Sequence, residues 1–177
     1  MTREEKILEL INKQEDLPKF EELTFTLNLD EEPLPYARER HTRFGGKNGK
    51  GRFYNKRAPY MDRIHEVFAR QVDKDLRSQI DKIIAEKETK KYYVNVVGRF
   101  YIKIPKSDSM KIAALKEMQV IRPTVVRGDV DNYIKLILDV LHDIAYDDDA
   151  HVISINSEKY YSLHPRVELE ITIKYEV

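Results

Sequence analysis

Apolar residues recur at three- and four-residue spacing in four stretches of the chain, and each stretch predicts a helix. Residues 3–13 form the short amphipathic helix of an N-terminal extension that we place at 1–20. Residues 59–87 predict the longest helix, which we interpret as scaffold. Shorter helices are predicted over 107–119, where a serine can cap the first turn, and over 130–144.

Four other stretches predict strands. Residues 23–29 alternate apolar and polar side chains, as half-buried strands do. Residues 91–104 are denser in apolar side chains, which favours a central place in the sheet. Residues 151–155 and 166–175 follow, and because only the turn around His164 separates them, we expect an antiparallel hairpin. The expected fold class is α/β, more narrowly α+β. It has a small mixed β-sheet of about four strands packed against two or three helices.

Length and composition indicate one globular domain over residues 1–177, with 41% hydrophobic and 35% charged residues. There is no cysteine, which excludes disulfides and thiolate metal sites. The first residues lack the apolar core of a signal peptide, and no apolar run approaches the roughly 20 residues of a membrane span. We therefore expect a cytoplasmic protein without a membrane partner.

The net charge of zero conceals a strong asymmetry along the chain. Residues 36–57 carry a single acid, Glu39, among many cations and several glycines and aromatic residues. Such a stretch can be an ordinary solvated loop, or an arm that grips phosphates and stacks on unpaired bases. For the second reading the DNA-binding candidates are Arg38, Arg40, Arg43, Lys47, Lys50, Arg52 and Lys56.

The opposite charge gathers in residues 127–152. Asp129 and Asp131 stand where a helix should begin, and Asp147 to Asp149 stand where it should have ended. We expect the fold to bring the two groups together, at a cost in like-charge repulsion that a cation would relieve. Oxygen ligands without cysteine suit Mg²⁺, with Mn²⁺ as a possible substitute. A calcium-binding EF-hand loop is excluded, because Val152 occupies the position that requires glycine.

The order and spacing of this segment resemble the RusA family of Holliday-junction-resolving endonucleases. The matching pattern is Asp129-x-Asp131-Asn132-x-x-Lys135, then Asp139-x-Leu141, then Tyr146-x-Asp148-Asp149-x-x-Val152 and Lys159. Pro35, Arg38 and Arg40 before a glycine-containing basic loop are similar too, so the resemblance extends over most of the chain from about residue 22. The predicted helix at 107–119 is not part of it.

The resemblance implies a Mg²⁺-dependent homodimer that nicks opposing strands of a four-way DNA junction symmetrically. It implies that Asp129, Asp131 and Asp149 are the catalytic, metal-binding aspartates and that Lys135 is the essential lysine. Asn132, Asp148 and Lys159 are then supporting residues, Asn132 by orienting a carboxylate or a water. These roles suit phosphodiester hydrolysis, which needs an activated water and relief of negative charge on the phosphate.

Two other functions remain open at this point. The chain could be a catalytically silent module that binds branched DNA around a structural ion. It could also be a metal-dependent phosphohydrolase acting on nucleotides, although no P-loop or other glycine-rich phosphate motif supports nucleotide binding.

Overall fold

The computed structural model describes residues 1–13, 17–36, 40–42, 52–54, 57–124 and 128–177. Along the chain its elements are α1 (Arg3–Lys13), β1 (Phe20–Leu29), β2 (Arg40–Thr42), β3 (Arg52–Tyr54), α2 (Ala58–Gln71), α3 (Lys74–Ala85), β4 (Tyr92–Lys103), α4 (Met110–Glu117), α5 (Val130–Leu141), the 3₁₀ turn η1 (Asp149–His151), β5 (Val152–Ser162) and β6 (Arg166–Glu176).

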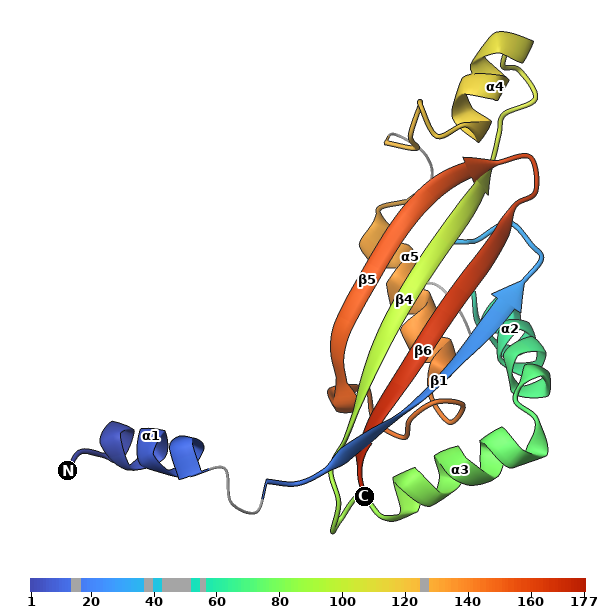
Figure 1. The fold of residues 1–177 in the computed structure, drawn as a ribbon. Coiled ribbons are helices and arrows are strands. Elements are labelled where there is room, and N and C mark those ends of the chain that lie inside the picture. The colour runs from blue at the N-terminus through green and yellow to red at the C-terminus, as the bar shows by residue number, and fades with distance from the viewer. Residues whose placement is uncertain (14–16, 37–39, 43–51, 55–56, 125–127) are drawn as a thin grey trace.

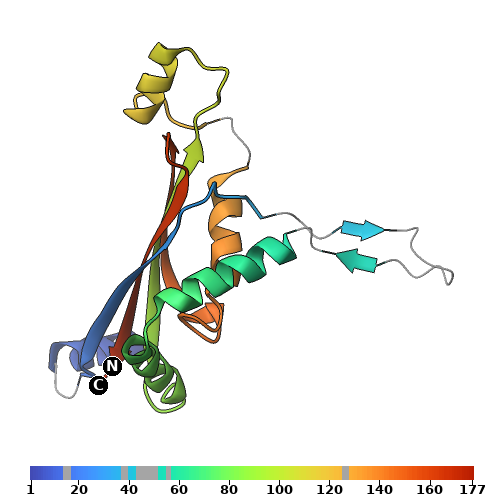
Figure 2. The same cartoon turned by 90° about the vertical axis from the view of Figure 1, so that its right-hand side faces the viewer.

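The main sheet has four strands in the order β1-β6-β4-β5 (Figure 1). β6 runs antiparallel to both β1 and β4, whereas β5 runs parallel to β4. The prediction of a small mixed sheet is confirmed, and so is the central position of residues 91–104. α2 and α5 lie on one face of the sheet (Figure 2), and their apolar side chains join those of the strands in one buried core.

The predicted hairpin between the last two strands is wrong. β4 lies between β5 and β6, so these two strands do not pair. The connection from Leu163 to Pro165 can make this step, because three residues reach about 10 Å, or two strand spacings. Alternating burial along β4 explains the outcome, since a strand buried this thoroughly needs a partner on each edge.

The single long helix predicted over residues 59–87 is two helices. Val72 adopts an extended backbone after α2, and Asp73 caps α3 by accepting a hydrogen bond from the Leu76 amide at 2.8 Å. The apolar spacing continues across this break because both helices bury one side. The sequence pattern therefore gave no sign that a new helix begins at Asp73. Gln71, at the end of α2, donates to the Asn28 carbonyl and accepts from its amide, so α2 is tied to the edge strand β1.

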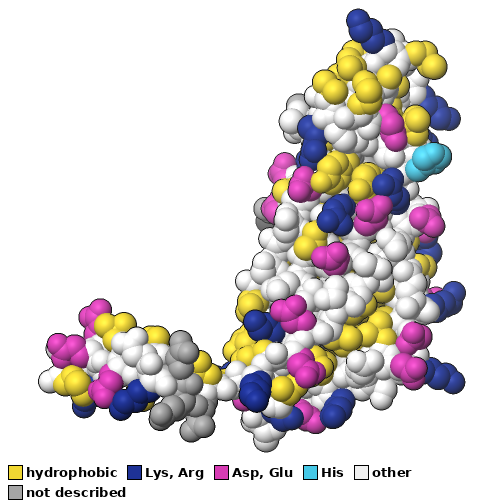
Figure 3. All heavy atoms as spheres, in the orientation of Figure 1, with side chains coloured by type: hydrophobic (Ala, Val, Ile, Leu, Met, Phe, Trp, Pro, Cys, Tyr) yellow, Lys and Arg dark blue, Asp and Glu magenta, His cyan; other side chains and the backbone are white. Residues whose placement is uncertain are grey.

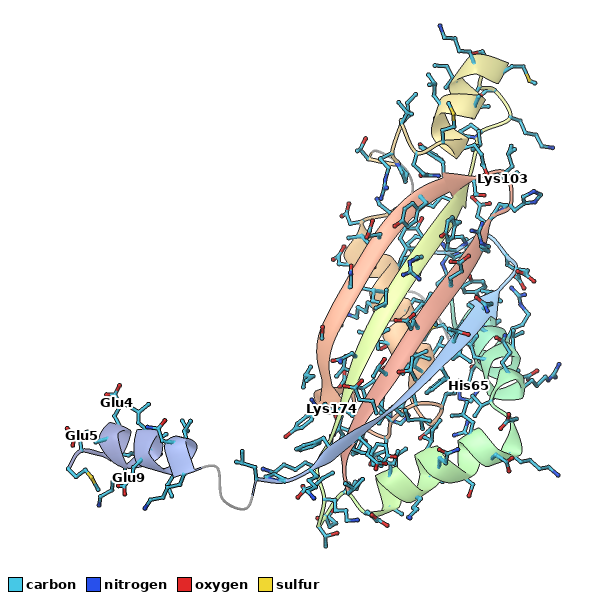
Figure 4. The ribbon with its side chains drawn as sticks, in the orientation of Figure 1. Glu4, Glu5, Glu9, His65, Lys103 and Lys174 are labelled. Atoms are coloured by element: carbon cyan, nitrogen blue, oxygen red, sulfur yellow. The ribbon has the colours of Figure 1, made fainter. Side chains whose placement is uncertain are left out.

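The helices predicted over residues 3–13 and 107–119 are confirmed as α1 and α4, and Ser109 accepts a hydrogen bond from the Ile112 amide at the start of α4. α1 buries no residue, and Figure 4 shows its acids Glu4, Glu5 and Glu9 on a helix that stands apart from the sheet. The open face of the sheet carries Lys and Arg beside Asp and Glu (Figure 3). Within the described ranges, no helix is long and apolar enough to cross a membrane.

Candidate functional site

The beginning of α5 is fastened to two distant segments. Asp129 occupies the N-cap with an extended backbone, although its side chain makes no capping hydrogen bond. Gly128, just before it, has a φ of +100° and lies against Pro35. The Lys159 ammonium of β5 donates to the Gly128 carbonyl at 3.1 Å, and the Tyr36 amide donates to the Asn132 carbonyl at 2.8 Å. The carboxylates at the helix start are therefore presented from a fixed backbone.

One face of α5 is buried and the opposite face is polar. The predicted apolar stripe is confirmed by the buried side chains Ile134, Ile137 and Leu141, with Leu138 partly buried. Tyr133, Leu136 and Val140 are buried as well. Asp131, Lys135 and Asp139 are exposed and follow one another at four-residue spacing on the other face. The Lys135 ammonium lies 4.6 Å from the centre of the Tyr36 ring, a cation–π contact that holds the lysine one turn from Asp131.

The carboxylate of Asp147 is bound by side chains that are distant in sequence. It forms an ion pair with Lys87 and accepts a hydrogen bond from the Tyr92 hydroxyl at 2.5 Å. Burial alone would raise the pKa of Asp147, but these two hydrogen bonds outweigh it and hold that pKa below its ordinary value. His151 stacks on the Tyr92 ring with 3.9 Å between ring centres. Asp147 is therefore a structural anchor for the loop that carries Asp148 and Asp149.

The remaining acids of this loop border a surface hollow of about 360 Å³. Its lining is Leu138, Asp139, His142, Tyr146, Asp147, Asp148 and Asp149. Burial raises the pKa of Asp139, the positive charge of Lys135 opposes that rise, and the negative charge of Asp149 adds to it. One carboxylate oxygen of Asp148 accepts a hydrogen bond from the Ala150 amide at 2.9 Å and so caps η1.

The sequence pattern did not reveal the partners that organise this end of the molecule. Lys87 comes from the turn after α3 and Tyr92 opens β4, so neither lies near the acidic segment in the chain. In the sequence, Asp139 stands out only as part of the family pattern. In the structure, the negative charge of Asp149 acts on the Asp139 carboxylate, and both residues line the hollow.

The expected three-aspartate metal site is not assembled within one chain. The donors suit magnesium chemically, since they are all carboxylate oxygens. Among the residues that the structure describes, however, no three Asp, Glu, His or Cys side chains gather to hold one ion. Asp129 and Asp131 begin α5, whereas Asp149 lies beyond its end, and a 12-residue helix is about 18 Å long. The helix and β5 run in opposite directions (Figures 1 and 2), which keeps the two acidic groups apart.

The basic segment is described only in part. Arg38, Arg43, Lys47, Lys50 and Lys56 lie outside the described residues. Arg40 and Arg52 belong to the backbone of β2 and β3, which pair antiparallel with Arg40 opposite Tyr54 and Thr42 opposite Arg52. The described residues of this segment therefore form a two-stranded antiparallel pair.

Comparison with known proteins places the chain near one nuclease family. A family model described as "Endodeoxyribonuclease RusA" matches residues 30–172, a span that includes both acidic groups and the basic segment. The chain is also similar to "Uncharacterized protein YqaN" of Bacillus subtilis (strain 168), with 40% identity over 80 residues, 44% of this chain and 56% of that protein. The match thus spans little more than half of that relative's length.

Proposed function

The chain belongs to the RusA family of endodeoxyribonucleases, and on that premise we propose that it resolves Holliday junctions in DNA recombination and repair. It acts as a homodimer on four-way or other branched DNA and makes paired, symmetric nicks in a Mg²⁺-dependent reaction. The observation that carries this proposal is the family match over residues 30–172, which encloses the complete Asp–Asp–Lys–Asp pattern. Two-fold symmetry suits the substrate, because it presents two equivalent sites to two equivalent strands.

The proposed catalytic residues are Asp129, Asp131, Lys135 and Asp149. The three carboxylates are the ligands for Mg²⁺, for which Mn²⁺ is a possible substitute. An ion held by these carboxylates would supply positive charge to the phosphate and would lower the pKa of a nearby water. Lys135 adds a fixed positive charge beside Asp131, and its contact with the Tyr36 ring supports a defined position for that charge.

The supporting residues have structural contacts that fit their proposed roles. Lys159 holds the Gly128 carbonyl and thereby the start of α5. The backbone of Asn132 is tied to Tyr36, which leaves its side chain to orient a carboxylate or a water. Asp148 caps η1 and so sets the backbone of Asp149. The arginines and lysines of residues 38–56 would bind the phosphates of the junction arms.

Variants that remove one carboxylate without changing its size test the assignment. Asp131→Asn and Asp149→Asn should lose junction cleavage yet keep junction binding, because each removes a charge from the cutting site and leaves the basic segment intact. Asp62→Asn is the matched control, since Asp62 is an exposed aspartate of α2 far from both acidic groups in sequence, and it should cut like wild type. Loss of binding in the first two variants would show that Asp131 and Asp149 have structural roles instead.

A second candidate function is favoured by one observation. Because the described part of one chain gathers no three potential metal ligands, the protein could bind branched DNA without cutting it. In that case a labelled junction would be bound but would remain uncut over a range of Mg²⁺ and Mn²⁺ concentrations.

A further inference from the structure

The N-terminal helix α1 carries a stripe of apolar side chains that the described residues leave uncovered. Ile7, Leu8 and Ile11 are between 46% and 57% exposed and share one face at three- and four-residue spacing. α1 also precedes the span of the family match, which begins at residue 30. We infer that α1 is a docking arm: it packs into a hollow beside α3 of a second copy, whose own α1 packs into the hollow of the first.

The sequence specifies this helix although α1 buries none of its residues. Thr2 and Glu5 form a capping box, in which the Thr2 amide donates to the Glu5 carboxylate at 2.6 Å and the Glu5 amide donates to the Thr2 hydroxyl at 3.2 Å. Glu9 and Lys13 form an ion pair one turn apart, at 2.9 Å. An 11-residue helix is still marginal in water, because most helical stability in proteins comes from packing of an apolar face. The arm therefore needs a partner surface.

A hollow of about 280 Å³ lies where α3, the start of β1 and the end of β6 meet. Its apolar lining is Ile83, Tyr175 and Val177, and Val177 is 51% exposed. Ile83 and Tyr175 are partly buried and pack against the core from this side, so apolar side chains that enter the hollow would extend the core. A helix laid in such a hollow by residues three and four apart is a recurring mode of recognition.

The charges of the hollow match those of the stripe. The acids of its lining already have partners, each at 3.1 Å: Glu21 with the Tyr175 hydroxyl, Glu86 with the Lys90 ammonium and Glu176 with the Lys91 amide. The exposed ammonium groups of Lys82 and Lys91 pair with no acid in the described part of the chain. Glu4 lies on the stripe one turn before Leu8, on the opposite side of α1 from Glu9 (Figure 4). Its carboxylate and the two ammonium groups are complementary across the contact.

The direction of the chain selects the hollow of another copy. In Figure 1, α1 and α3 leave the same end of the sheet in opposite directions, so α1 points away from its own hollow. The Val177 amide donates to the Lys19 carbonyl at 3.0 Å, which fixes the chain at the edge of the sheet. Pro18 has a locked φ and restricts Leu17 to extended conformations, which keeps the arm from turning back directly. Because each copy offers one arm and one hollow, the exchange closes at two copies.

Cross-linking through introduced thiols tests the exchange without using nuclease activity. The protein has no cysteine, so Leu8→Cys places one thiol on the stripe and Gln79→Cys places another on the exposed lining of the hollow. A short bis-maleimide should convert this double variant into a covalent dimer on a denaturing gel. Leu8→Cys alone should stay monomeric. Leu8→Cys with Lys106→Cys is the matched control and should stay monomeric too, because Lys106 is exposed beyond the other end of β4.

The other results would overturn the exchange. A double variant linked only within one chain, seen as a monomer whose tryptic digest joins positions 8 and 79, would show that α1 folds back onto its own copy. A covalent dimer of Leu8→Cys alone would show that two α1 helices pair with each other. No cross-link, or equal linking in the Lys106→Cys control, would show that α1 does not dock in the hollow.

A second pair of variants tests the stripe itself in the double-thiol background. Ile11→Gln removes an apolar contact and should lower the yield of covalent dimer about tenfold, at protein concentrations below the dissociation constant. Lys6→Gln places the same side chain on the opposite face of α1 and should leave the yield unchanged. Equal yields from the two variants would overturn the stripe as the contact face. None of these positions belongs to the proposed catalytic or DNA-binding set, so the outcome is independent of whether the protein cuts DNA.

Discussion

Replacing Gly128 by alanine tests how the start of α5 is held. Gly128 has a φ of +100°, and a Cβ placed there would come 2.6 Å from Pro35 Cβ and 2.9 Å from Pro35 Cγ. The backbone conformation alone costs a non-glycine residue about 1–2 kcal/mol. Forcing an extra carbon into an occupied space costs about 1–3 kcal/mol more. We therefore expect Gly128→Ala to lower the free energy of unfolding by about 2–5 kcal/mol.

Urea unfolding followed by circular dichroism measures the free energy of unfolding. In Gly128→Ala the urea concentration at the midpoint should fall, while the dependence of that free energy on urea concentration stays unchanged. Pro35→Gly removes both Pro35 carbons that clash, so it separates the two contributions. In the Pro35→Gly background, Gly128→Ala should cost only the conformational part, about 1–2 kcal/mol. An equal cost in both backgrounds would refute the contact between Gly128 and Pro35. A cost below about 0.5 kcal/mol in the wild-type background would refute the strained backbone as well.

Three further changes test the loop, the hollow and the basic segment. Tyr92→Phe removes the hydrogen bond to Asp147 and should lower the free energy of unfolding at pH 7 by about 1–3 kcal/mol. Because the pKa of Asp147 is lowered in the fold, the charged carboxylate stabilises the protein above about pH 4, and this stabilisation is lost as pH falls further. The urea midpoints of variant and wild type should therefore converge in acid. A difference that stays constant with pH would contradict this. The pKa of Asp139 is raised in the fold, so its charged carboxylate destabilises the protein once pH rises above that pKa. Asp139→Asn should therefore raise the urea midpoint at pH 7 but not at pH 3. A lower midpoint at pH 7 would count against the crowding of negative charge at the hollow. Replacing Arg38 and Arg40 by alanine should flatten the salt dependence of junction binding by about 0.9 log unit per lost phosphate contact, and an unchanged slope would remove them from the DNA interface.

Local patterns carried most of the prediction of the fold. The buried stripe of α5 and the alternation of β4 follow from side-chain periodicity within each element, so both were predictable. The break between α2 and α3 was missed because the signal lies in one capping residue, Asp73, inside a continuous apolar repeat. Neighbouring strands in sequence pair more often than not, and β5 and β6 depart from that tendency because β4 needs partners on both edges.

The residue types of the candidate site could be proposed from the sequence, but their spatial arrangement could not. The clustering of acids along the chain pointed to Asp129, Asp131 and the group Asp147 to Asp149, and the resemblance to the RusA family singled out Asp149 within that group. The sequence could not show that α5 and β5 run in opposite directions, which separates the two acidic groups by the length of the helix. Nor could it show that Asp147 is neutralised by Lys87 and Tyr92, because those contacts depend on the packing of β4 against the loop. Contacts between segments that are distant in the chain leave little trace in one sequence.

We propose that this chain cuts branched DNA at paired, symmetric positions with a divalent metal. The direct measurement uses a four-way junction labelled on each of its four strands in turn, incubated with the wild-type protein in Mg²⁺ and in EDTA, beside a linear duplex of the same sequence. We expect nicks at matching positions on two opposing strands of the junction, in Mg²⁺ only, and none in the duplex. Equal cutting of the duplex, or an intact junction in Mg²⁺ and Mn²⁺ despite binding, would contradict the proposal.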